Sequence, residues 1–109
     1  MDNINESDWK YLSELRKTLL ERLCNRILDN IETECKGKKR KPDVHEQYRK
    51  IYHLIKKWDE TVADCFNDWN RSDIFFNILF LIKYQVITNK EINKLSDDTK
   101  ERIKVYSNR

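Results

Sequence analysis

Turn residues are almost absent from this chain, which contains a single glycine, Gly37, and a single proline, Pro42. A β-sheet protein needs such residues at its turns, about every ten residues along the chain. The rest of the 109-residue sequence is instead rich in Leu, Ile, Lys, Glu, Asp and Asn. We therefore predict an all-α fold, and a chain of this length forms a single domain.

Apolar residues in the first third of the chain repeat at the three- and four-residue spacing that makes one stripe on a helix. They are Leu12, Leu15, Leu19, Leu23, Ile27 and Ile31. We expect helix one over residues 8–34, with Ser7 as its N-cap and Asp8 well placed against the helix dipole. Residues 35–42 hold the only glycine and proline together with five basic side chains, which predicts a basic linker.

A second apolar stripe predicts helix two over residues 43–67. The stripe consists of Tyr48, Tyr52, Ile55, Val62, Phe66 and Trp69, and it is widened by Ile51, Leu54 and Trp58. Asp43 and Glu46 at its start form a variant of the capping box, in which each side chain accepts from a backbone N–H group.

We predict that residues 68–109 form a compact head of short helices. The longest apolar run, Ile74 to Ile82, is interrupted by Asn77 and falls short of the ~18 residues of a membrane helix. It is typical of a helix that other helices surround, and Ser72 is its expected N-cap.

Capping patterns divide the remainder of the head. Thr88 and Glu91 match the capping box of a short helix through Leu95. Ser96 is the expected cap of a last helix that starts with two acidic residues and reaches about Tyr106.

The two long helices are too long for the core of one chain. About 25 residues at ~1.5 Å per residue make a helix of nearly ~40 Å, whereas a domain of ~100 residues has a radius of gyration near ~13 Å. We therefore predict a homodimer closed about a two-fold axis. It would pair the helix-two stripes through Tyr48, Tyr52, Ile55 and Val62, or pair helix one with the neighbour's helix two.

Charge and cysteine content give little sign of a special partner. The 22 basic and 19 acidic residues leave a net charge of only +3, which is weak evidence for binding to nucleic acid or membrane. The three cysteines, Cys24, Cys35 and Cys65, form no Cys-x-x-Cys pair, and the first ten residues show no signal-peptide pattern. These features favour a reduced, cytoplasmic protein.

No combination of residues provides a complete catalytic or metal site. His45 and His53 would lie about 12 Å apart along one helix, too far to share a metal ion. The single glycine cannot build a phosphate-binding loop, and neither nucleophile motifs nor dinucleotide fingerprints occur. We expect a protein that is not an enzyme and needs no cofactor.

A cluster of carboxylates on helix two leaves one catalytic alternative open. It consists of Asp59, Glu60, Asp64 and Asp68, and paired carboxylates act as acid and base where burial separates their pKa values. Lys56, Lys57 and Arg71 lie close enough in the sequence to form ordinary helix-surface ion pairs with them instead, and we favour that interpretation.

Two surface features remain as binding candidates. The basic run from Lys36 to Lys41, followed by Arg49 and Lys50, could contact phosphates of a nucleic acid, although no aromatic interleaving or helix-turn-helix pattern accompanies it. Aromatic residues gather where helix two meets the head, and exposed tryptophans are typical anchors of protein interfaces. The expected partner-binding residues are Trp58, Trp69, Arg71, Phe75 and Phe76, with burial of both tryptophans at the helix junction as the alternative.

From Tyr48 onward the chain resembles the fluorescence recovery protein family and the bacterial proteins similar to it. The resemblance covers about half of the chain in spacing and apolar pattern. It rests on the long helix Tyr48 to Phe66, on Asp68-Trp69-Asn70-Arg71-Ser72, on the run Ile74 to Ile82, on Val86 to Ile92, and on Leu95-Ser96 with Lys100 to Ile103.

The resemblance implies a helical homodimer with a long-helix stalk and a small head. In the photoprotective members the dimer binds the C-terminal domain of orange carotenoid protein and speeds its return to the resting state. Those members carry a tryptophan, an aspartate and an arginine along the long helix, where gapless matching places Lys50, Leu54 and Glu60 here. We expect a shared scaffold that serves a different partner.

Overall fold

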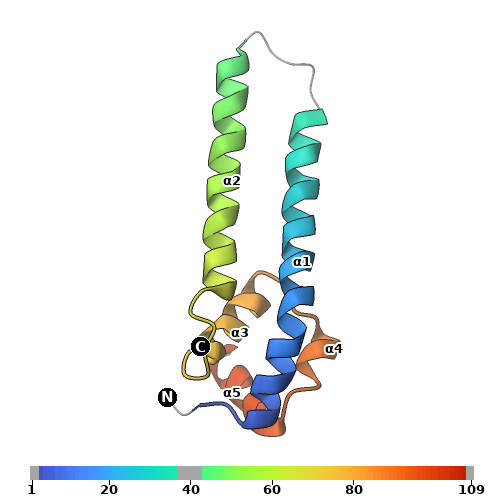
Figure 1. Cartoon of the computed structure of the whole chain (residues 1–109), viewed down its shortest axis with the longest axis vertical. Helices are drawn as coiled ribbons and strands as arrows, with labels where there is room; N and C mark the ends of the chain where they lie inside the picture. Colours follow the sequence, from blue (N-terminus) through green and yellow to red (C-terminus); the bar gives the residue numbers. More distant parts are fainter. Residues whose placement is uncertain (1–2, 37–42, 108–109) are drawn as a thin grey trace.

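A computed structural model of the chain describes residues 3–36 and 43–107. They form five α-helices and no strand within these two ranges, which confirms the all-α class. The helices are α1 (Glu6–Lys36), α2 (Val44–Phe66), α3 (Ile74–Lys83), α4 (Asn89–Ile92) and α5 (Asp97–Ser107). α1 and α2 run antiparallel as a long hairpin, and the three short helices gather at one end of it (Figure 1).

The molecule is elongated. Its principal extents are 56 × 24 × 22 Å and its radius of gyration is 17.3 Å, against about 13 Å for a typical domain of this length. α1 is longer than predicted at both ends and continues through Cys35 and Lys36, which were assigned to the basic linker. The rest of that linker, residues 37–42, lies outside the described residues.

Asn5 caps α1, and the prediction of Ser7 is wrong. The Asn5 side-chain oxygen accepts a hydrogen bond from the Asp8 backbone N–H at 2.8 Å, while the Ser7 hydroxyl also donates to it at 2.8 Å. Ser7 itself lies inside the first turn of α1. Because Asn and Ser are equally good N-caps, the sequence alone could not separate them.

At the start of α3 an asparagine again takes the capping role that was expected of a serine. Asn70 accepts from the Asp73 backbone N–H at 2.9 Å and from the Ser72 hydroxyl at 2.7 Å, so Ser72 is not the cap. Asp73 occupies the cap position itself without a side-chain capping hydrogen bond. Its carboxylate accepts a hydrogen bond from the Asn70 side-chain amide at 3.2 Å instead.

The other predicted caps agree with the structure in most respects. Asp43 accepts from the Glu46 backbone N–H at 3.0 Å, although the reciprocal bond of a full box is absent among the described residues. Thr88 and Glu91 make both bonds of a capping box, at 3.1 and 2.9 Å. Their helix ends at Ile92, earlier than predicted.

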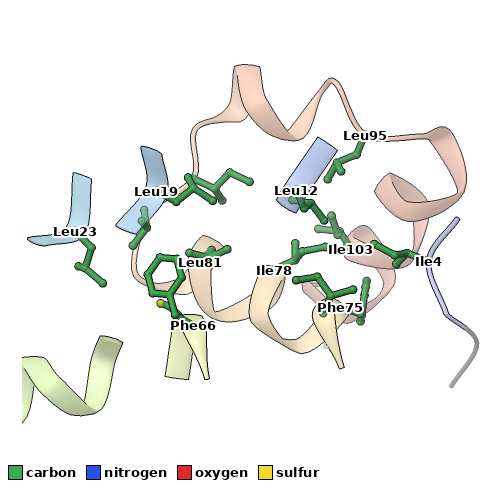
Figure 2. Close-up of a cluster of buried hydrophobic side chains, with 14 residues drawn as sticks. Ile4, Leu12, Leu19, Leu23, Phe66, Phe75, Ile78, Leu81, Leu95 and Ile103 are labelled. Carbon is green, nitrogen blue, oxygen red and sulfur yellow. The ribbon is translucent and has the colours of Figure 1, made fainter. Parts of the chain in front are cut away.

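The buried core occupies one half of the molecule. It is formed by the first part of α1, the last turn of α2, α3, α5 and the segments on either side of α4 (Figure 2). Its members are Ile4, Leu12, Leu19, Leu23, Cys65, Phe66, Ile74, Phe75, Ile78, Leu81, Val86, Ile87, Leu95 and Ile103. We call this half, residues 3–23 and 61–107, the head.

Asp8 ties α5 to the start of α1. Its carboxylate is 2 % exposed and accepts from the Ser96 backbone N–H, the Ser96 hydroxyl and the Thr99 hydroxyl, at 2.9, 2.6 and 2.6 Å. Ser96 also accepts from the Thr99 N–H, as its predicted role as N-cap of α5 requires. A carboxylate at a helix N-terminus is favoured by the dipole, here across 88 residues of sequence.

Two arginines of α1 hold the end of α3 and the α4 capping box. Arg22 bonds to the Val86 carbonyl at 2.7 Å and makes a two-pronged ion pair with Glu91 at 2.7 and 3.1 Å. Arg26 donates to the carbonyls of Tyr84 and Gln85, both at 2.7 Å. These contacts satisfy backbone carbonyls of the segment that follows α3.

Candidate interaction surfaces

The remaining part of the hairpin, residues 24–36 of α1 and 44–60 of α2, we call the stalk. Along α2 it presents large apolar side chains to solvent. Val44, Tyr48, Tyr52 and Ile55 are 58, 66, 48 and 50 % exposed, and their spacing places them on one side of the helix. With Ile51, Lys56 and Asp59 beside them, they form the surface that we call the stalk face.

Three of the four predicted dimer residues belong to this surface, namely Tyr48, Tyr52 and Ile55. Val62 differs because it is half-buried and packs against the head core. The helical stripe of α2 thus passes from solvent into the core along its length. Periodicity finds such a stripe but does not show where its burial begins.

Polar contacts join the two helices of the stalk. The Trp58 indole N–H donates to the Asn30 side-chain oxygen at 2.9 Å, and the Lys50 ammonium lies 3.3 Å from the Glu34 carboxylate. Trp58 is half-buried in this contact and turned toward α1. Its side chain therefore offers only part of its ring to a partner.

The second predicted anchor, Trp69, lies at the end of the head. Its ring stacks on Phe66 with centroids 5.9 Å apart, and the Arg16 guanidinium sits over both rings at 5.5 and 5.3 Å. Its indole nitrogen is shielded from solvent and has no hydrogen-bond partner among the described residues. Nearby, Arg71 pairs with Glu6 at 2.7 Å on the surface.

The two predicted phenylalanines are separated by burial. Phe75 is 1 % exposed in the core, stacked edge-on with Tyr106 at 5.2 Å, so it has no surface to offer a partner. Phe76 is 44 % exposed. On a helix that is apolar on nearly every side, only the packed structure decides which aromatic reaches solvent.

A groove with acidic and aromatic walls separates the end of α2 from α3, and we call it the α2–α3 groove. It has a volume of about 450 Å³ and is lined by Ala63, Asp64, Asn67, Asp68, Asp73, Phe76, Asn77 and Phe80. The sequence placed Asp64 and Asp68 in a helix-surface cluster with Asp59 and Glu60. The structure instead combines them with Asp73, which precedes the next helix.

Ionisable groups elsewhere offer little chemistry. Burial raises the pKa of the Cys65 thiol to about 11, which keeps this sulfur protonated and unreactive near neutral pH. A hydrogen bond to the Asp64 carboxylate raises the pKa of Tyr84 above its usual value. His45 and His53 are exposed on the stalk, and no group of three potential metal ligands occurs in the part of the chain that the structure describes.

None of the helices in the described ranges is long and apolar enough to cross a membrane. No protein-family model, curated protein or solved structure matches the chain.

Proposed function

We propose that this protein is a non-enzymatic homodimeric interaction protein, whose stalk pairs with a second copy and whose head binds another protein. The observation that carries the proposal is the stalk face, where four large apolar side chains are each about half exposed or more in a single chain. Contiguous apolar surface of this kind typically marks an interface. Its position on a long helix suits pairing with an identical helix.

The charge pattern of α2 favours an antiparallel pair. Along α2 the charge changes sign twice, from Glu46 through the basic residues Arg49, Lys50, Lys56 and Lys57 to the acidic residues Asp59, Glu60 and Asp64. A two-fold axis across the stalk face near Tyr52 would bring Lys56 and Lys57 of one copy toward Glu46 of the other, whereas a parallel pair would oppose like charges. A second copy therefore complements this surface in both apolarity and charge.

We infer a partner other than that of the fluorescence recovery protein family, which the sequence resembles. Of the three positions that would match the family's functional residues, Lys50 is paired with Glu34 of α1, and Leu54 is half-buried. These residues hold the hairpin together. The head surface around Trp69, Arg71 and Phe76 is the better candidate for contact with another protein.

A solution mass tests the dimer directly. We expect light scattering at micromolar concentration to give twice the chain mass, and Ile55→Asp to weaken association by at least about 100-fold because a charge enters an apolar interface. Val105→Asp is the matched control, since Val105 is 49 % exposed but lies on α5 in the head. A wild-type mass of one chain, or equal weakening by both variants, would contradict the proposal.

A further inference from the structure

We infer that the α2–α3 groove binds a lysine or arginine side chain presented by a basic segment of the partner protein. The inference rests on the proposed function, in that the head binds another protein, and it gives that partner a chemical character. It concerns a surface separate from the stalk face. Three features of the groove support it independently.

The first feature is uncompensated negative charge. None of Asp64, Asp68 and Asp73 forms a salt bridge within residues 3–36 and 43–107. Asp64 and Asp68 also lie at the C-terminal end of α2, whose last turn has no basic residue. The helix dipole is negative there and favours cations, so acidic residues are placed against the local preference. A bound cation would reduce the repulsion among the three carboxylates and their repulsion by the negative end of the α2 dipole.

The second feature is an unused hydrogen-bond acceptor. Asn77 lines the groove and is only 4 % exposed. Its amide nitrogen donates to the carbonyls of Cys65 and Asn67, both at 2.9 Å, which fixes the orientation of the side chain. The amide oxygen accepts no hydrogen bond from the described residues. Such a fixed acceptor fits an N–H group of an ammonium or guanidinium ion.

The third feature is the aromatic wall. Phe76 is 44 % exposed and lines the groove with Phe80. Lysine and arginine carry apolar stems that pack on aromatic rings while their charged ends reach polar groups. At the edge of this region the Lys83 ammonium already lies 6.0 Å from the centre of the Phe80 ring and 5.3 Å from that of Tyr84. An apolar wall facing carboxylates matches both parts of a basic side chain, whereas a bare metal ion would use only the charged part.

A labelled peptide tests the inference on the full chain. The probe is fluorescein-Gly-Arg-Leu-Lys-Arg-Leu-Gly, compared with the same peptide carrying glutamate in place of each basic residue. We expect fluorescence anisotropy to detect binding of the basic peptide alone. Asp68→Asn with Asp73→Asn should weaken it at least tenfold, because two carboxylates are lost without loss of volume. Asn also tolerates the positive φ of 55° at Asp68.

The control pair is Glu14→Gln with Glu21→Gln, which removes the same charge from exposed positions on α1. Equal weakening in both pairs would show general charge attraction and overturn the inference, as would failure of the wild-type chain to bind the basic peptide. Phe76→Ala should weaken binding as well, and unchanged binding would exclude the aromatic wall. Light scattering on the same samples separates the two proposals, because a dimer that ignores the peptide refutes only the groove.

Discussion

The head and the stalk contain the same kinds of apolar residue but use them differently. Among the described residues, all fourteen buried hydrophobic side chains lie in the head, whereas no side chain in residues 24–36 or 44–60 is fully buried. The head closes on itself because α1, the end of α2 and α5 contribute side chains to the same core as α3 (Figure 2). The stalk has only two helices, so each helix can bury only the part of its apolar stripe that contacts the other. The difference indicates that the head provides most of the stability of the chain, while the stalk leaves apolar surface exposed.

The largest expected effect tests where that stability resides. Leu81 is fully buried, and Leu81→Ala should lower the free energy of unfolding by about 2–5 kcal/mol through lost burial and a residual cavity. Ile31→Ala in the stalk should cost about half as much, since Ile31 is already partly exposed. Urea unfolding followed by circular dichroism measures both. Equal losses would contradict the division into a stable head and a dependent stalk.

Sequence periodicity predicts the long helices well but not this division. Leu19 and Tyr48 both belong to predicted stripes, yet one is fully buried and the other is 66 % exposed. Spacing shows which side of a helix is apolar, whereas burial depends on how many neighbours reach that side. The homodimer is predicted because the two long helices are too long for the core of one chain, and it stays a prediction.

Some local polar contacts can be predicted because one short segment contains both partners. The Thr88 and Glu91 capping box is an example, because its two bonds join residues three apart. The α2–α3 groove could not be predicted in the same way. Asp64 and Asp73 converge only because the chain reverses direction between α2 and α3, and the role of Asn77 depends on carbonyls exposed by the end of α2. The only sequence signal was the absence of a basic residue in that last turn.

Acid should weaken the head more than the stalk. Hydrogen bonds from Arg22 and then from Thr88 lower the pKa of Glu91 from 4.5 to about 2, despite some opposing desolvation. Glu91 therefore takes up a proton more readily in the unfolded chain than in the folded one. The stability that its ionised carboxylate contributes is complete above about pH 4.5 and is lost as the pH falls toward 2. The loss should reach up to about 3 kcal/mol.

The measurement is urea unfolding at pH 5 and at pH 2.5, for wild type and for Glu91→Gln. The variant should show a smaller difference between the two pH values, because the group that titrates has been removed. Glu101→Gln, at an exposed position on α5, is the control and should keep the wild-type difference. If Glu91→Gln also kept it, other carboxylates would account for the acid sensitivity.

The smallest expected effect compares two indole N–H groups, one in each region. Trp58→Phe removes the hydrogen bond to Asn30 and should cost about 1 kcal/mol, typical of a partly buried pair. Trp69→Phe removes a shielded N–H that has no partner among the described residues, and this relief offsets the smaller ring, so its cost should be lower. Urea unfolding of both variants at one protein concentration gives the comparison. A larger loss for Trp69→Phe would show that stacking with Phe66 and Arg16 matters more to this fold than the polar contacts between the two stalk helices.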